Sequence, residues 1–502
     1  MGPAIVHSRA QLGIEAPEVT IEVLLSGGLP GFNIVGLAEA AVRESKDRVR
    51  GAIISSGFSF PQERITVSLG PADMKKTGGR FDLPIALGIL AASRHIPPES
   101  LAGLEFYGEL GLNGEIRTIP GALPAALKAT TAGRSVFVPV GNGPEARLSS
   151  ASVFVAGTLL RVTSHLNGCS EVEPQRPLRP PKGRADAPDL RDVRGQHLAK
   201  RALEIAAAGG HNILLIGPPG AGKSMLARRL PGILPPMSER QALQTAAVTS
   251  ILGKDIDLDE WRLRPFRAPH HTASTAALVG GGSIPRPGEI SRAHNGVVFL
   301  DELPEFNRRV LESLREPMEA GCIAISRAGC QAEFPARFQL VAAMNPCPCG
   351  YLGDALGDCG CSAERVRNYR SKISGPLLDR IDIHLTVQRP PKESLRPNSP
   401  LGESTRAVAR RVVAARDTQR RRAGRCNARL EGDALFEHCG LTSRGWRLLE
   451  KAMDSFGMSA RAHQKVLKLA RTIADLANEE CIRTRHVSEA LGLRQLDRTA
   501  GR

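Results

Sequence analysis

The sequence predicts a multidomain α/β protein, and three observations support this. The chain has 502 residues, more than one hydrophobic core usually serves. An apolar content of 42% beside 24% charged residues is typical of a globular protein in water. Along the chain, short strands with glycine turns give way to strands that alternate with helices, and then to helical periodicity alone. Three domains and one linker are therefore expected.

Residues 1–168 are expected to form an α+β domain. Apolar runs such as TIEVLLSGGLPGFNIVGL and RITVSLGP alternate with glycine turns, and AEAAVRESKDRVRGAIISSG and DLPIALGILAASR have helical periodicity. Residues 169–188 are rich in proline and charge and have almost no large apolar residue. That composition is typical of an extended linker.

Residues 189–390 alternate between strand and helix patterns. The predicted strands are NILLIG, GVVFLDE, CIAIS, FQLVAAMNP and IDIHLTV, and GQHLAKRALEIAAAG is one of the helices. This order predicts a largely parallel sheet covered by helices. Residues 391–502 are expected to form a basic helical domain, in which Ser459 is the N-cap of SARAHQKVLKLARTIADLAN.

Composition also limits the compartment and the partner. No window approaches the roughly 18 to 20 apolar residues of a membrane span, and the N-terminus lacks the features of a secretory signal. A cytoplasmic protein is expected, whose ten cysteines stay reduced. The formal net charge is +16, and residues 391–502 hold 23 basic against 13 acidic residues. This excess favours a polyanionic partner, although a solvated helical surface is the alternative.

The stretch GPPGAGKS, which follows an apolar strand and opens a helix, is predicted to bind a nucleotide. In the pattern G-x-x-x-x-G-K-[ST], glycines let backbone N–H groups wrap phosphates, the lysine reaches the β and γ oxygens, and the hydroxyl binds Mg²⁺. ATP and Mg²⁺ are therefore the expected cofactors. The residues of this phosphate loop are Gly217, Pro218, Pro219, Gly220, Ala221, Gly222, Lys223 and Ser224.

Farther along the chain, NGVVFLDE predicts a buried strand that ends in two acids. Asp301 is expected to hold the Mg²⁺ shell, and Glu302 to orient and deprotonate the attacking water. An ordinary strand end is the simpler interpretation of this stretch in isolation. Its position after the phosphate loop favours the catalytic interpretation.

With these motifs, residues 189–502 resemble the AAA+ ATPases of the magnesium-chelatase-like branch, and the resemblance implies three more site residues. VAAMNP is similar to the sensor-1 strand and places Asn345 near the γ-phosphate. SGPLLDRIDIH is similar to the arginine-finger segment, which makes Arg380 the candidate to reach a neighbouring subunit's nucleotide. SARAHQK is similar to sensor 2, with Arg461 at the start of a lid helix. A finger supplied in trans implies a closed ring, and the resemblance points to a homo-hexamer.

Two longer stretches resemble the YifB/ComM family, and the similarity runs nearly from end to end. They are FRAPHHTASTAALVGGGSIPRPGEISRAHNGVVFLDELPEF and, near the N-terminus, GPADMKKTGGRFDLPIALGIL. The resemblance implies an ATP-driven DNA motor that promotes branch migration during recombination of incoming DNA in natural transformation. Single-stranded or branched DNA is the implied partner, together with recombination proteins. The N-terminal domain is implied to have the fold shared by Lon protease and ribosomal protein S5.

Proteolysis is not expected from that N-terminal domain. Lon-type cleavage needs a serine nucleophile activated by a lysine. Asp82 stands where the serine would align, and Lys128 is interpreted as a surface lysine. Residues 1–168 are therefore expected to be a scaffold or a DNA-facing platform.

Four cysteines lie close together in NPCPCGYLGDALGDCGCS, directly after the sensor-1 strand. Four thiolates could bind Zn²⁺ tetrahedrally, but both pairs have C-x-C rather than the usual C-x-x-C spacing. A zinc site and a reduced glycine-rich loop therefore remain as alternatives. The residues are Cys347, Cys349, Cys359 and Cys361.

The segment between the two nucleotide motifs offers DNA-contact candidates. Adjacent residues such as His270 and His271 rarely present both rings to one metal ion, so a polar loop that lines the pore is the preferred interpretation. Arg286 and Arg292 accompany flexible glycines, a combination that suits contacts to a phosphate backbone. Aromatic residues make up only 4% of the chain, so base stacking is not expected to dominate.

Two other functions compete with the DNA motor. The alternative is a magnesium-chelatase-like ATPase that remodels a protein partner. Chelatase motors with a similar ATPase core lack the Lon-like N-terminal domain, which favours the DNA motor. An ATP-dependent protease is disfavoured by Asp82.

Overall fold

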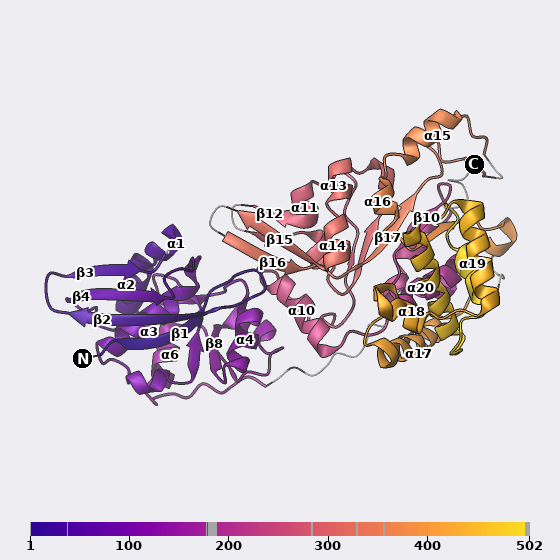
Figure 1. Ribbon diagram of the computed structural model, residues 1–502. Coiled ribbons are helices and arrows are strands. Elements are labelled where there is room, and N and C mark those ends of the chain that lie inside the picture. The colour runs from indigo at the N-terminus through magenta and orange to yellow at the C-terminus, as the bar shows by residue number, and fades with distance from the viewer. Residues whose placement is uncertain are drawn as a thin grey trace.

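A computed structural model describes residues 2–496, except residues 38, 177, 179–187, 283–284, 328–329, 355–356, 397 and 399. The N-terminal domain, the α/β core and the C-terminal helices follow one another in a row (Figure 1). Half of the predicted linker, residues 169–188, falls outside the described residues. In the part of the chain that the structure describes, no helix combines the length and apolar character that a membrane span requires.

The N-terminal domain is built on a seven-stranded mixed sheet with the strand order β3-β4-β2-β1-β5-β8-β9. Its strands are β1 (Ala4–Arg9), β2 (Glu18–Ser26), β3 (Gly31–Val35), β4 (Arg64–Gly70), β5 (Leu104–Phe106), β8 (Ser135–Pro139) and β9 (Val153–Ala156), and β6 (Glu109–Leu110) and β7 (Ile116–Arg117) form a separate ladder. Its helices are α1 (Ala40–Arg43), α2 (Ser45–Ser55), α3 (Asp82–Ala92), α4 (Ala122–Thr131), α5 (Gly143–Ala146) and α6 (Leu159–Leu166). Side chains alternate across β8, where Phe137 joins the core beneath α3 and α6, and Val136 and Val138 join the core beneath α4. Both faces of this end of the sheet are therefore covered by helices.

The core is a five-stranded sheet with the order β11-β14-β17-β10-β18, and every adjacent pair is parallel. The strands are β10 (Ile213–Ile216), β11 (Phe266–Arg267), β14 (Val297–Leu300), β17 (Gln339–Met344) and β18 (Ile383–Thr386). The helices are α7 (His197–Gly209), α8 (Lys223–Ala227), α9 (Leu230–Ile233), α10 (Glu239–Ser250), α11 (Thr275–Val279), α12 (Glu289–Arg292), α13 (Arg308–Glu312), α14 (Arg315–Ala320), α15 (Ala363–Arg370) and α16 (Gly375–Leu378). Every residue of β10, β14 and β17 is buried, which explains their unbroken apolar runs. The predicted mixed α/β core is confirmed.

One of the strands predicted for the core lies outside the parallel sheet. CIAIS belongs to β15 (Cys322–Arg327), which pairs with β16 (Cys330–Pro335) in an antiparallel hairpin outside the parallel sheet. Its side chains alternate between buried Ile323 and Ile325 and exposed Ala324, as expected for a ribbon with one covered face. A second hairpin outside the sheet pairs β12 (Gly280–Gly281) with β13 (Arg286–Pro287).

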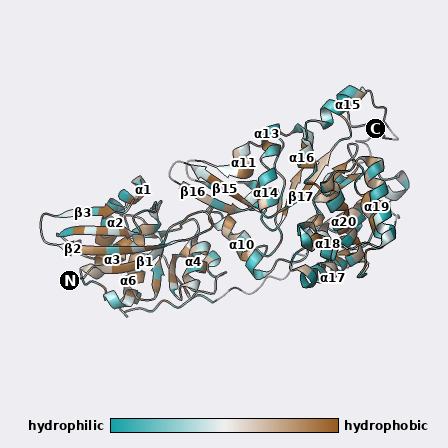
Figure 2. Cartoon of the chain, in the orientation of Figure 1, coloured by the Kyte–Doolittle hydropathy of each residue, from teal (hydrophilic) through white to brown (hydrophobic). Residues whose placement is uncertain are grey.

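The C-terminal region is helical, as predicted. It contains α17 (Thr405–Ala423), α18 (Asp433–His438), α19 (Ser443–Phe456), α20 (Ala460–Leu476) and α21 (Thr484–Gly492). Ser459 caps α20 by accepting a 3.2 Å hydrogen bond from the Ala462 N–H. Leu469 and Ile473 of α20 share one core with α7, while hydrophilic residues lie on the outer sides of α17 and α19 (Figure 2).

The N-terminal domain contacts the core through α4 and α10. The Gly121 N–H donates to the Ser250 carbonyl at 2.9 Å, and the Leu123 N–H donates to the Ser250 hydroxyl at 3.3 Å. Leu123 also packs with Ala246 and Trp261 in a small apolar cluster. The two domains are therefore joined by a packed contact as well as by the chain.

Candidate nucleotide site

The phosphate loop connects β10 to α8 at the carboxyl edge of the parallel sheet, where ligands bind in open α/β folds. A Cβ atom on Gly217 would lie 2.2 Å from the Val387 carbonyl oxygen, so only glycine fits there. Gly220 and Gly222 have φ values of +77° and +87°, in the left-handed region that glycine adopts without strain. Gly217 is therefore required by a close backbone contact, whereas Gly220 and Gly222 are required by their left-handed backbone conformation.

Lys223 is buried in this loop and lies beside Asn345. Its Nζ donates to the carbonyl oxygens of Gly217 at 2.6 Å and Pro218 at 3.0 Å, and to Asn345 Oδ1 at 3.1 Å. Burial lowers the pKa of the Lys223 ammonium, and Asp301 and Glu302 oppose that shift. The structure thus brings together two residues that are far apart in the sequence but follow the adjacent parallel strands β10 and β17.

Ser224 and Asp301 also meet. The Ser224 hydroxyl donates to Asp301 Oδ2 at 2.7 Å, while Asp301 Oδ1 accepts a 3.0 Å hydrogen bond from the Glu302 N–H. A hydroxyl and a carboxylate are oxygen ligands of the kind that Mg²⁺ prefers. Glu302 has a φ of +52°, a strained value for a residue with a side chain, and such strain is concentrated at functional sites.

A histidine that the sequence did not assign to this site contacts Glu302. His271 Nδ1 lies 3.3 Å from Glu302 Oε2, and the His271 ring packs edge-on against Phe306. His270 instead contacts the Thr272 hydroxyl at 2.9 Å. His271 follows β11, the parallel neighbour of β14, so the shared carboxyl edge of these strands was the signal that could have located it.

Arg380 and Arg461 both lie beside Asp379, Arg380 as its neighbour in the chain and Arg461 through an ion pair. Arg380 donates to the Pro376 carbonyl at 2.7 Å and pairs with Glu319 at 2.5 Å. Arg461, with 67% of its side chain exposed, is 3.9 Å from the Asp379 carboxylate. Among the described residues, no hydrogen bond or ion pair joins either arginine to the phosphate loop.

The two DNA-contact candidates differ in their surroundings. Arg286 is exposed on β13, beside a cavity of about 470 Å³ that Arg292 also lines. Arg292 pairs with Glu289, which also accepts a 2.6 Å hydrogen bond from Arg267. Arg286 is thus more available to a phosphate than Arg292.

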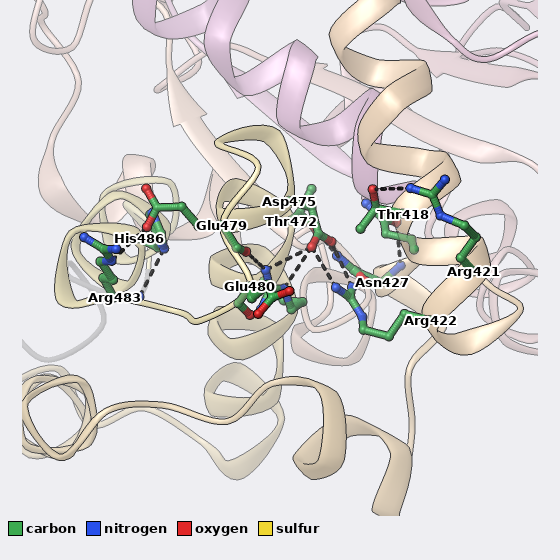
Figure 3. Close-up of polar contacts among 12 residues, drawn as sticks. Thr418, Arg421, Arg422, Asn427, Thr472, Asp475, Glu479, Glu480, Arg483 and His486 are labelled. Carbon is green, nitrogen blue, oxygen red and sulfur yellow. Dashed lines mark hydrogen bonds and ion pairs between the residues drawn. The ribbon is translucent and has the colours of Figure 1, made fainter.

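A buried polar network holds the C-terminal helices together (Figure 3). The Asp475 carboxylate accepts from Arg422 at 2.8 and 2.9 Å, from Asn427 at 2.8 Å and from Arg471 at 3.0 Å. Asn427 also donates to the Thr472 hydroxyl at 3.1 Å. Part of the positive charge of this region therefore stabilises its own fold.

This network continues to the segment that carries Arg380. His211 lies just before β10. It contacts the Thr472 hydroxyl at 2.8 Å and lies 3.5 Å from Asp382. Lys465 of α20 pairs with Asp382 at 2.5 Å, and together with His211 it holds the pKa of that carboxyl well below its usual range despite burial. The helical region is therefore fixed to the strand next to Arg380.

The four cysteines converge as the residues of a metal site would. Cys347 Sγ lies 3.3 Å from Cys349 Sγ and 3.6 Å from Cys359 Sγ, and all four sulfurs, including that of Cys361, fall within 4.8 Å of one another. Tetrahedral Zn–S bonds of about 2.3 Å place sulfurs about 3.8 Å apart, so the thiolates fit a zinc ion. The same loop covers the phosphate loop, since a Cβ on Gly350 would lie 2.8 Å from a Pro219 ring carbon.

In the N-terminal domain, Asp82 is fully buried at the start of α3. Arg48 donates to its carboxylate at 2.7 and 3.1 Å, yet burial raises the pKa of Asp82 to about 6. Lys128 pairs with Glu15 at the surface. Among the described contacts, none joins Asp82 to Lys128.

Three family descriptions match consecutive parts of the chain. "Subunit ChlI of Mg-chelatase" matches residues 21–142, "Magnesium chelatase, subunit ChlI" matches residues 189–395, and "Magnesium chelatase, subunit ChlI C-terminal" matches residues 402–494. The uncharacterized protein YifB of Salmonella typhimurium is 50% identical over 99% of this chain and 98% of its own length. The competence protein ComM of Haemophilus influenzae is 48% identical over the same shares. The chain belongs to the YifB/ComM family.

The YifB/ComM family is thus a magnesium-chelatase-like branch of the AAA+ ATPases, and ATP and Mg²⁺ are the cofactors that this membership implies. The magnesium-chelatase 67 kDa subunit of Chlorobaculum parvum is 28% identical over 31% of this chain and 23% of its own length. The N-terminal match also carries a chelatase description, so the N-terminal domain by itself does not separate a DNA motor from a chelatase-like ATPase.

Proposed function

We propose that this protein is an ATP-driven, ring-forming DNA motor that promotes branch migration of recombination intermediates during natural transformation. The observation that carries the proposal is the end-to-end similarity to a protein named for competence, in a chain whose phosphate loop, Asn345 and Asp301 form one compact site. Competence requires the handling of incoming DNA, and a motor requires a nucleotide site of this kind.

In the proposed cycle, each side chain of the site has one task. The phosphate loop and Lys223 bind the ATP phosphates, and Ser224 and Asp301 hold Mg²⁺. Glu302 accepts the proton of the attacking water, and Asn345, which contacts the Lys223 ammonium, orients the γ-phosphate. His271 contacts the Glu302 carboxylate and orients it.

Completion of the site by a neighbouring subunit explains where Arg380 and Arg461 lie. Both sit beside Asp379 and have no described contact with the phosphate loop of their own chain. We propose that they serve the nucleotide of the adjacent subunit in a hexameric ring. Each hydrolysis step then depends on the interface between two subunits.

A phosphate backbone is the partner that the surface charge supports. Several arginines of α17 and of the loop after it are exposed, and none has an ion pair among the described contacts; they are Arg406, Arg410, Arg420, Arg421 and Arg425. Arg286, on its hairpin, adds a cation that could follow a strand through the ring. Such contacts bind DNA with little dependence on base sequence and weaken steeply with salt.

The four-cysteine cluster is proposed to bind one structural Zn²⁺. The ion would be held by Cys347, Cys349, Cys359 and Cys361, and it would supply rigidity rather than redox chemistry. It would fix the turn at Gly350 against Pro219 and so steady the phosphate loop. Elemental analysis should find one zinc per chain, and a Cys359→Ser/Cys361→Ser variant should lose it. A folded, metal-free wild type would refute the assignment.

The N-terminal domain is proposed to be a non-proteolytic platform with a Lon- and S5-like fold. A buried Asp82 paired with Arg48 provides no nucleophile for acyl transfer. The packed contact between α4 and α10 gives this domain a mechanical connection to the motor. Purified protein should therefore leave an unfolded substrate such as casein intact in the presence of ATP.

A chelatase-like ATPase that remodels a protein partner is the second candidate, because the descriptions of all three matched segments name a magnesium-chelatase subunit. ATP turnover with and without DNA separates the two functions. The DNA motor predicts that single-stranded or branched DNA raises turnover at moderate salt. Stimulation by a protein partner, with no response to DNA, would favour the remodeller.

A further inference from the structure

Arg380 lies folded against its own subunit. Only 13% of its side chain is exposed, although a residue that serves a neighbour must reach across an interface. It lines a cavity of about 420 Å³ whose other wall is formed largely by α14. Its Nε is buried and has no described partner, so the guanidinium is not fully satisfied where it lies.

One carboxylate in this cavity holds Arg380. Glu312 pairs with Arg315, and Glu316 has no described contact with Arg380, whereas Glu319 pairs with Arg380 at 2.5 Å. Glu319 lies near the end of α14 with 61% of its side chain exposed, so it can be displaced without disturbing the core. The pair is partly open to water and therefore of modest strength.

A terminal phosphate is a stronger partner for a guanidinium than Glu319 is. It carries more charge than a carboxylate and offers several acceptor oxygens to the two-pronged arginine side chain. When a neighbouring subunit presents ATP at this face, exchange of one anion for the other would bring Arg380 out of the cavity. At an interface without ATP, Arg380 would stay paired with Glu319.

We propose that Glu319 is the resting counter-ion of Arg380, a positioning residue that retains the finger until a neighbour's γ-phosphate replaces it. The inference rests on the proposed role of Arg380 in trans. Retention opposes hydrolysis, because part of the binding energy of Arg380 for the transition state is used to break the Glu319 pair. Removing the carboxylate should therefore raise turnover at interfaces to which this chain donates its finger.

Rings assembled from two different variant chains test directly whether Glu319 retains Arg380. Chains with Arg380→Ala keep a working nucleotide site but donate no finger, whereas chains with Glu302→Gln donate a finger but do not hydrolyse. Arg380→Ala protein is mixed with an excess of either Glu302→Gln or Glu302→Gln/Glu319→Gln protein, and phosphate release is measured at saturating ATP. The mixture with the Glu319→Gln change should turn over about two- to fivefold faster, the effect expected from loss of a partly exposed ion pair.

The matched control is Glu302→Gln/Glu316→Gln, which removes the same charge from the same cavity without touching Arg380. It should behave like Glu302→Gln alone, and thermal unfolding should show that all variants fold. Equal or slower turnover with Glu319→Gln would overturn the inference while leaving the finger in trans supported. If no mixture hydrolyses ATP although each protein binds it, the role of Arg380 in trans fails, and the inference fails with it.

Discussion

Lys223→Ala and Glu302→Gln should separate nucleotide binding from hydrolysis. Lys223 is buried and directs its Nζ at three oxygens of the loop and of Asn345, so phosphate oxygens would receive charge-assisted hydrogen bonds there. Such bonds contribute about 1.5–3 kcal/mol each. Loss of two of them should weaken ATP binding by about 3–6 kcal/mol, which corresponds to roughly 10²–10⁴-fold.

Glu302 makes a different kind of contribution. More than half of its side chain is exposed, and its one described side-chain ion pair is with His271, so glutamine should leave the phosphate contacts intact. Loss of a general base slows a reaction by about 10²–10⁴-fold, or about 3–5 kcal/mol in the activation barrier. Titration with a fluorescent ATP analogue measures binding, and phosphate release measures turnover.

The matched control for this pair is Glu305→Gln, an exposed carboxylate nearby that pairs with Lys372 at 3.3 Å. It should turn over ATP like the wild type. Wild-type hydrolysis by Glu302→Gln, or wild-type ATP affinity in Lys223→Ala, would refute the roles assigned to these two residues.

Three further predictions concern other parts of the molecule. His271→Ala should lower kcat severalfold with little change in KM, and it should have no further effect in a Glu302→Gln background; additive effects in the double variant would contradict the contact. Asp382→Asn should lower the free energy of unfolding by about 3–5 kcal/mol in urea denaturation, because Lys465 would be left with an uncompensated charge in a buried site. The pKa of Asp82 is raised to about 6, so the folded state binds its proton more tightly than the unfolded chain does. The stability of the wild type relative to Asp82→Asn should therefore fall by about 2 kcal/mol as the pH rises from 4 to 7, and a flat difference would contradict the burial.

The sequence was informative wherever a local pattern determines the structure. The apolar runs of β10, β14 and β17 predicted the parallel core, and the Ser459 N-cap predicted the start of α20. CIAIS had the same apolar character but forms an antiparallel hairpin, because a short apolar run does not reveal which strand will pair with it. Pairing depends on residues that are distant in the sequence.

Motifs placed Ser224 with Asp301 and Lys223 with Asn345, but contacts between distant segments that no motif specifies could not be predicted from the sequence. Nothing in the local pattern around His271 shows that its ring meets Glu302, and nothing around Arg380 shows that Glu319 pairs with it. The charge count of residues 391–502 likewise did not distinguish arginines that stabilise the fold, such as Arg422 on Asp475, from arginines that are exposed to a partner. These distinctions require the positions of side chains from several elements.

The most direct test of the proposed motor is the movement of a synthetic four-way DNA junction whose arms carry separate fluorescent labels. Wild-type protein with ATP and Mg²⁺ should convert the junction into its two duplex products. Glu302→Gln should bind the same junction but leave it unconverted, and binding should weaken steeply as salt rises because backbone contacts release counterions. A wild-type preparation that hydrolyses ATP, yet neither binds nor moves the junction at moderate salt, would contradict the central claim.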